Sequence, residues 1–168
     1  MSDHESPLTQ HIPRLRRYAR ALTGDRSAAD DLVQDTLERA LSRFHLWRHG
    51  SDLRAWLFTI MHNLYVNQVR ARVRQQQDAL EDSAAEALHA REPDWIEIRA
   101  IDDALARLPD EQRSTLLLVG LEQFTYDEAA RILGIPVGTV MSRLSRGRER
   151  LRTIYESDAR SKALKVVK

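Results

Sequence analysis

Apolar residues recur every three or four positions along most of the chain, and no stretch alternates with the period of two that marks a strand. Three helices are predicted in the first half: Pro7 to about Leu22, Asp25 or Ser27 to about Trp47, and about Leu53 to Arg74. Gly24 is suited to end the first helix and Asp52 to cap the third. The apolar positions expected to face a shared core are Leu8, Ile12, Leu15, Ala19, Leu22, Leu32, Val33, Leu37, Ala40, Leu41, Phe44, Leu53, Leu57, Ile60, Met61 and Leu64.

The second half predicts a helix from about Asp94 to Leu108, another from Pro109 to about Gly120, and then two short helices joined by a tight turn. Thr125 and Glu128 have the spacing of a capping box at the start of the first short helix. Gly134 suits the left-handed residue that ends it, and Pro136 prevents helical continuation. This arrangement is a helix-turn-helix.

The last helix of this motif has two chemically different sides. Val140, Leu144, Gly147 and Leu151 lie on one side at spacings of four, three and four. Hydroxyls and guanidiniums lie elsewhere on its circumference, as expected of a helix in a DNA major groove. These candidate contacts are Thr139, Ser142, Arg143, Arg146 and Arg150. The alternative is an ordinary helical hairpin with a solvated basic face.

The pattern predicts an all-α protein of two small domains. Residues 7–75 are expected to form a bundle of three to four helices, and residues 94–156 a four-helix domain that contains the helix-turn-helix. Residues 76–93 are polar and acidic and are interpreted as a flexible linker. Residues 157–168 are interpreted as a loose basic tail.

The net charge of +1 alone argues against nucleic-acid binding, but its distribution does not. Residues 141–168 hold nine basic side chains against three acidic ones, whereas residues 76–98 hold seven acidic side chains and one basic. The absence of cysteine favours the cytoplasm, and we expect no signal peptide and no membrane span. No catalytic motif appears and the six histidines are scattered, so we expect neither an enzyme nor a metal or other cofactor.

The third helix of the first half carries a polar stripe opposite its apolar face: Asn63, Asn67, Arg70 and Arg74. Asparagine can hydrogen-bond base edges and arginine can hold phosphates. Trp47 and Trp56 lie nearby, and unpaired bases commonly stack on such rings over a basic groove. The alternatives are that Trp56 and Phe58 belong to the core and that Asn63 is merely solvated.

The chain resembles bacterial sigma factors of the extracytoplasmic-function (ECF) class, within the sigma-70 family. The resemblance rests on AADDLVQDTLERAL (Ala28–Leu41), LRAWLFTIMHNLYVNQVR (Leu53–Arg70) and the block from Leu108 to Arg152 that contains the helix-turn-helix. It implies an initiation subunit of RNA polymerase. Region 2 (7–75) would bind the β′ clamp helices and open the −10 element, and region 4 (94–156) would recognise the −35 element and contact the β flap.

The resemblance also assigns residues to these roles. Core polymerase would meet Asp31, Gln34, Asp35 and Glu38, although a solvated helix face is the alternative. For the −10 element the resemblance assigns Asn63 and Asn67, with the Trp47–Ser51 loop as a base pocket. The chemistry of the polar stripe and its neighbours adds Trp56, Arg70 and Arg74. The −35 element would meet Thr139, Ser142, Arg143, Arg146 and Arg150. Met141 departs from the arginine of many members, and Ser145 from an aromatic in some, so the −35 sequence stays open.

The resemblance further implies an anti-sigma factor that packs between the two modules. The acidic linker would either enter a basic channel of the polymerase or act as a plain tether. Two other functions are kept open: a helix-turn-helix regulator that does not bind core polymerase, and a sigma-mimic that acts only through protein contacts.

Overall fold

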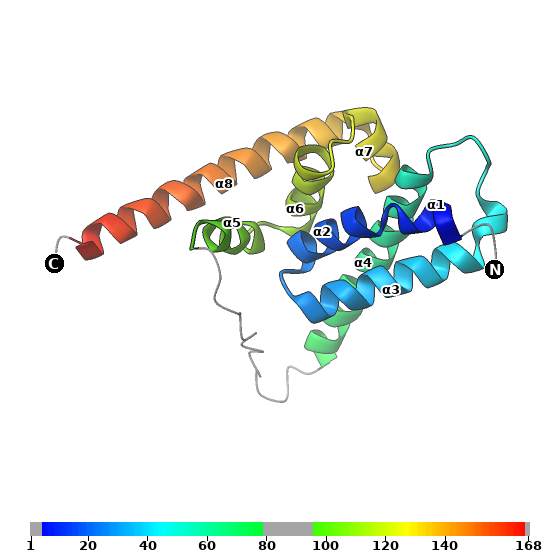
Figure 1. Ribbon diagram of the computed structural model, residues 1–168. Helices are drawn as coiled ribbons and strands as arrows, with labels where there is room; N and C mark the ends of the chain where they lie inside the picture. The colour runs from blue at the N-terminus through cyan, green and yellow to red at the C-terminus, as the bar shows by residue number, and fades with distance from the viewer. Residues whose placement is uncertain (1–4, 79–95, 167–168) are drawn as a thin grey trace.

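The computed structural model describes residues 5–78 and 96–166, which are helical almost throughout and contain no strand. The first module consists of α1 (Glu5–Thr9), α2 (Ile12–Thr23), α3 (Arg26–Ser42), a 3₁₀ turn at Phe44–Leu46 and α4 (Leu53–Asp78). The second consists of α5 (Ile96–Ala106), α6 (Asp110–Leu116), a π-helical turn at Leu117–Leu121, α7 (Tyr126–Leu133) and α8 (Val137–Val166). Both modules and the long α8 are visible in Figure 1. The all-α, two-module prediction is confirmed.

The core of the first module is built where α2, α3 and α4 pack together. Leu15, Leu32, Leu57 and Met61 are fully buried there, as the spacing predicted. Tyr18 joins them, with its ring edge against Phe58 at 5.2 Å between ring centroids. The alternative that placed Phe58 in the core is therefore correct.

Several boundaries differ from the prediction. The helix expected from Pro7 to Leu22 is broken, because Pro13 lies in the first turn of α2, where its missing N–H and fixed φ favour a new helix start. The second helix ends at Ser42 instead of reaching Trp47. The prediction that Leu41 faces the core is wrong, since it is 49% exposed in the last turn of α3.

Two other segments are more helical than expected. The third helix continues to Asp78, beyond the predicted module boundary at 75. The tail predicted to be loose from 157 onward continues α8 to Val166, so that α8 has 30 residues. The rest of the predicted linker, 79–93, and the question of whether it enters a polymerase channel lie outside the described residues.

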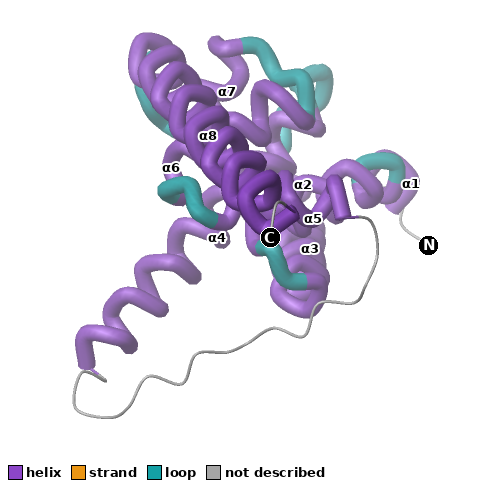
Figure 2. Tube along the Cα trace, turned by 90° about the vertical axis from the view of Figure 1, so that its left-hand side faces the viewer, coloured by secondary structure: helices purple, strands orange, loops and turns teal. Residues whose placement is uncertain are grey.

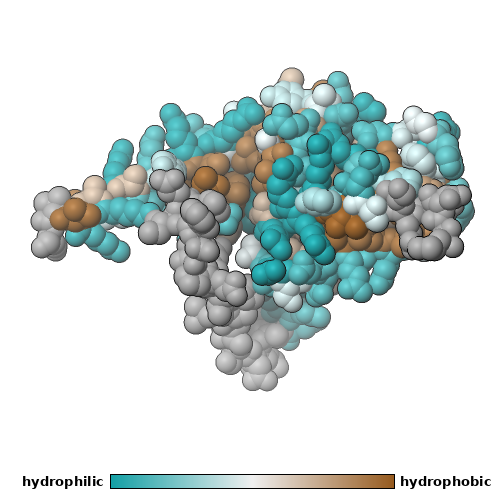
Figure 3. Space-filling view, in the orientation of Figure 1, coloured by the Kyte–Doolittle hydropathy of each residue, from teal (hydrophilic) through white to brown (hydrophobic). Residues whose placement is uncertain are grey.

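The two modules pack directly against each other, with α4 against α7, and α2 against both α5 and the turn at Leu117–Leu121. Figure 2 shows α5 beside α2, while the end of α4 extends away from the molecule. On the face in Figure 3, hydrophilic groups predominate, and hydrophobic ones gather where α5 runs beside α8. No helix within residues 5–78 or 96–166 is long and apolar enough to cross a membrane.

Candidate nucleic-acid and polymerase interfaces

The helix-turn-helix has the local structure that its sequence predicted. The Thr125 side chain accepts a hydrogen bond from the Glu128 N–H at 3.2 Å, and the Glu128 carboxylate accepts one from the Thr125 N–H at 2.8 Å. This capping box satisfies donors at the start of α7 that the helix itself cannot pair. Gly134 ends α7 with φ at +65°, the left-handed conformation that glycine adopts at little cost.

Three residues of α8 hold it to the rest of the second module: Val140, Leu144 and Gly147 are buried. Gly147 allows a close approach of α6, since a Cβ atom there would lie 2.9 Å from Cδ1 of Leu116, and the Leu116 side chain would have to shift. The close approach of α6 and α8 fixes the rotation of α8 about its axis. The opposite side of α8 is therefore turned to solvent.

The five candidate −35 residues do not share one environment. Arg146 and Arg150 are exposed, while Thr139 and Ser142 are half-buried, with the Ser142 hydroxyl donating to the Thr139 carbonyl at 3.1 Å. Arg143 lies toward α6, where its guanidinium is 3.6 Å from the Glu111 carboxylate and its side chain is only 21% exposed. Met141, 52% exposed, and the exposed Ser145 extend the solvent-facing surface beside Arg146.

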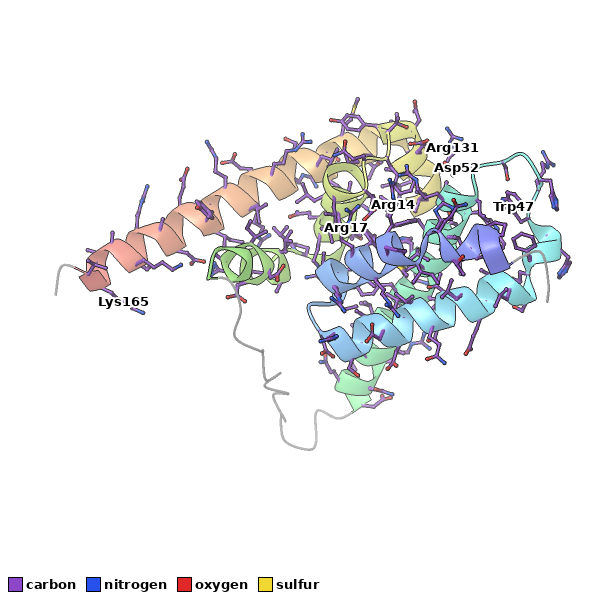
Figure 4. All side chains as sticks on the ribbon, in the orientation of Figure 1. Arg14, Arg17, Trp47, Asp52, Arg131 and Lys165 are labelled. Carbon is purple, nitrogen blue, oxygen red and sulfur yellow. The ribbon has the colours of Figure 1, made fainter. Side chains whose placement is uncertain are left out.

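The candidate −10 residues fall into two groups. Asn63, Asn67, Arg70 and Arg74 are exposed along α4. Trp47 and Trp56 are half-buried in an aromatic cluster with Phe44, at 5.4 Å and 6.4 Å between ring centroids. Figure 4 labels Trp47, which lies at the end of the first module away from the C-terminal end of α8.

A cavity of about 640 Å³ lies between the modules, at the side of α4 that carries the polar stripe. Asn63, Asn67 and Arg70 line it from α4, and Glu111 and Arg143 line it from α6 and α8. The structure thus brings candidate residues for the two promoter elements to the same cavity. His62 also lines it, and burial, aided by the nearby Arg143 charge, lowers the pKa of His62 to about 4.

The candidate polymerase-binding residues form an exposed row on α3: Asp31, Gln34, Asp35 and Glu38. The Gln34 side-chain amide donates to the Glu38 carboxylate at 3.2 Å. Because neither Asp31 nor Asp35 belongs to an ion pair found among the described residues, this row offers negative charge to a basic partner.

Sequence reasoning missed one group of residues at the contact between the modules. Glu122 is completely buried, and its carboxylate is 3.0 Å from the Arg17 guanidinium of α2. The signal that could have found it is a single acid directly after the apolar run Leu116–Leu121. Such a carboxylate must either face solvent or have a partner.

Two family profiles match the chain in the order of its modules. One, described as the Sigma2 domain of PhyR, matches residues 8–62, and the other, described as Sigma-70, region 4, matches residues 98–151. The ECF RNA polymerase sigma factor EcfG of Rhodopseudomonas palustris is 42% identical over 149 residues, which cover 88% of this chain and 82% of the relative. The chain belongs to the ECF sigma factors.

Solved structures agree with this assignment. The sigma factor RpoE of Bartonella quintana, crystallised with the anti-sigma factor NepR, is 36% identical and superposes with a TM-score of 0.80, covering 94% of this sigma factor and 99% of that chain. The anti-anti-sigma factor PhyR of the same organism shares the fold alone, at 20% identity and a TM-score of 0.59, covering 88% of this chain and 48% of PhyR. The first module is therefore region 2 and the second is region 4.

Proposed function

We propose that this sigma factor directs core RNA polymerase to promoters through three surfaces. Region 2 binds the β′ clamp helices through the α3 row and melts the −10 element along α4. Region 4 recognises the duplex −35 element through α8 and contacts the β flap. The observation that carries the proposal is the presence, on one sigma-factor fold, of a capped helix-turn-helix whose α8 exposes Arg146 and Arg150.

The side chains that each helix exposes determine which partner that helix can bind. Exposed guanidiniums on α8 can bind phosphates and guanine edges of intact duplex. Asn63 and Asn67 on α4 can hydrogen-bond the edges of bases that have left the stack, and Arg70 can hold the adjoining backbone. The carboxylates of α3 supply charge that is complementary to basic helices of the polymerase.

Run-off transcription with purified core polymerase tests the proposal. The intact chain should start RNA at a defined position with core alone, at promoters selected with the reconstituted holoenzyme. A helix-turn-helix regulator would need a separate sigma factor. A sigma-mimic would bind an anti-sigma factor and yield no specific transcript.

Variants with matched controls test which surface binds which partner. Arg146→Ala should lower the affinity for −35 DNA by about tenfold, the loss expected for one specific contact. Arg160→Ala, at an exposed position of the same helix, should leave that affinity unchanged. Asn63→Ala should impair the opening of duplex promoters, and its transcription should recover on a pre-melted template. Gln76→Ala, at an exposed position of α4, is its control.

Asp31→Asn combined with Asp35→Asn should weaken binding to core polymerase, whereas Glu156→Gln should leave that binding unchanged.

We also infer that an anti-sigma factor is a partner of this chain. The inference is supported by the similar RpoE, which was crystallised with NepR. A partner recovered with the tagged chain from its own cells should suppress run-off transcription when added in equal amount. A recovered protein that leaves transcription unchanged would not be an anti-sigma factor.

A further inference from the structure

Glu122 joins the two modules through an ion pair whose carboxylate is buried and whose guanidinium is half-exposed. The carboxylate belongs to region 4, is 0% exposed, and accepts a hydrogen bond from Nε of Arg17 of region 2 at 3.1 Å. The Arg17 guanidinium also lies 3.4 Å from the Leu121 carbonyl. Figure 4 labels Arg17 where α2 meets region 4.

A second arginine of region 2 holds the same segment. Arg54 of α4 donates to the Glu122 backbone carbonyl at 3.1 Å, and its guanidinium lies 4.0 Å from the centre of the Phe124 ring. Phe124 packs edge-on against Phe58 of region 2 at 5.1 Å. The segment 121–124 is thus bound by two cations and an aromatic ring from the other module.

This contact is strong only while all its members are present. A buried carboxylate that loses its cation keeps the full cost of its desolvation, whereas a separated one regains water. One oxygen of Glu122 and the hydroxyl of Tyr18 are buried without a hydrogen-bond partner among the described residues. Burial is the main cause that raises the pKa of Tyr18, and Glu122 adds to it. Because separation of the modules returns water to the Glu122 carboxylate, the junction is suited to reversible opening.

The closed arrangement also restricts access to the α4 stripe. Asn63, Asn67 and Arg70 face Glu111 and Arg143 across the cavity of about 640 Å³. Region 4 borders this side of α4, so a strand that followed the exposed Asn63, Asn67 and Arg70 would meet the Glu111 and Arg143 side chains.

We propose that Glu122, Arg17 and Arg54 form a latch that holds regions 2 and 4 closed, so that the free sigma factor cannot engage both promoter elements at once. The proposal rests on the proposed function. Binding to core polymerase opens the latch by holding the modules apart, and Glu122 then becomes hydrated. Arg17 and Arg54 are released and become available to anionic groups of the polymerase or DNA.

The test measures the separation of the modules in the full-length free chain. Because the chain has no cysteine, S42C on α3 and S157C on α8, both at exposed positions, give two specific sites for spin labels or fluorophores. Arg17→Gln should raise the ratio of open to closed molecules by about threefold to tenfold, a range that allows for solvent screening of a half-exposed side chain. Its matched control is Arg107→Gln, because Arg107 is similarly exposed (49% against 51%) and pairs with Asp158 within region 4.

A double-mutant cycle separates a latch from a purely local role of Glu122. The pair Arg17→Gln and Glu122→Gln should open the molecule little further than either single change, because both remove the same contact. Additive effects, an unchanged distance in Arg17→Gln, or equal opening in Arg107→Gln would each overturn the proposal. Since the distance is measured without polymerase, these outcomes are independent of whether the chain supports run-off transcription.

Discussion

Gln123 is the one non-glycine residue with positive φ in the described part of the chain, at +61°, and it lies between Glu122 and Phe124. This conformation costs a side-chain-bearing residue about 1 kcal/mol. Gln123 partly compensates by donating from its amide to the Gly120 carbonyl at 3.2 Å. The backbone turn that carries both neighbours into the contact between the modules is therefore held under strain.

Replacing Gln123 by glycine should relieve that strain. We expect Gln123→Gly to raise the free energy of unfolding by about 0.5 kcal/mol, and Gln123→Val to lower it by about 1 kcal/mol or more. Urea denaturation of the full chain gives both values. The opposite order of the two variants would contradict the prediction.

His62 should make stability depend on acidity. Its pKa is lowered to about 4 in the folded protein and is about 6.5 when unfolded, so the unfolded chain binds the proton first as pH falls. The contribution is fully present above pH 6.5 and is lost progressively toward pH 4. The midpoint of thermal unfolding should fall more steeply over this range in the wild type than in His62→Gln. The exposed His45→Gln should keep the wild-type slope.

Single residues show how far sequence reasoning reached. Core positions such as Leu15 and Leu57 follow from helical spacing, because one buried stripe determines them. Leu41 was misassigned because spacing alone cannot show that α3 ends at Ser42. The pairing of Glu122 with Arg17 could not be predicted, since the two residues are 105 positions apart.

At the scale of elements, the helix ends that were predicted correctly are those marked by short sequence motifs. The capping box at Thr125 and the left-handed Gly134 are short-range features, and both are present as predicted. The ends of long helices were less predictable, because the polar sequence after 157 gives no signal that distinguishes an exposed helix from a loose tail. The candidate polymerase and DNA contacts stay predictions that rest on family resemblance and exposure.

The packing of α6 against α8 should depend on the small size of Gly147. A valine there must displace Leu116, so we expect Gly147→Val to lower the free energy of unfolding by about 1–3 kcal/mol. Gly138 has open space around its Cβ direction, which makes Gly138→Val the matched change in the same helix. Equal losses in the two variants, measured by chemical denaturation, would show that helix propensity and not packing decides the effect.

At the scale of the whole molecule, the sequence predicted two modules and gave no indication of their relative placement. An acidic tether leaves that placement open, and contacts such as the Tyr65 hydroxyl donating to Asp110 at 2.7 Å join residues far apart in the chain. Only the assembled structure shows that the two modules share an interface with its own buried aromatic and ionic groups.

This shared interface should couple the unfolding of the two modules. Phe124 is 2% exposed and its ring packs against Phe58 and Arg54 of the other module. Phe124→Ala should therefore cost about 3 kcal/mol or more and split one calorimetric transition into two. A single transition that merely moves to lower temperature would show that the residue stabilises region 4 alone.

The continuous α8 gives the molecule a fixed internal length. Its 30 residues span about 45 Å at 1.5 Å per residue. Along it, Lys165 stands roughly 28 Å from Arg146, a separation equal to about eight base pairs. The charges of a loose tail could contact either the DNA or the polymerase. A continuous helix instead fixes the distance between the recognised DNA and any protein bound at the C-terminal end of α8.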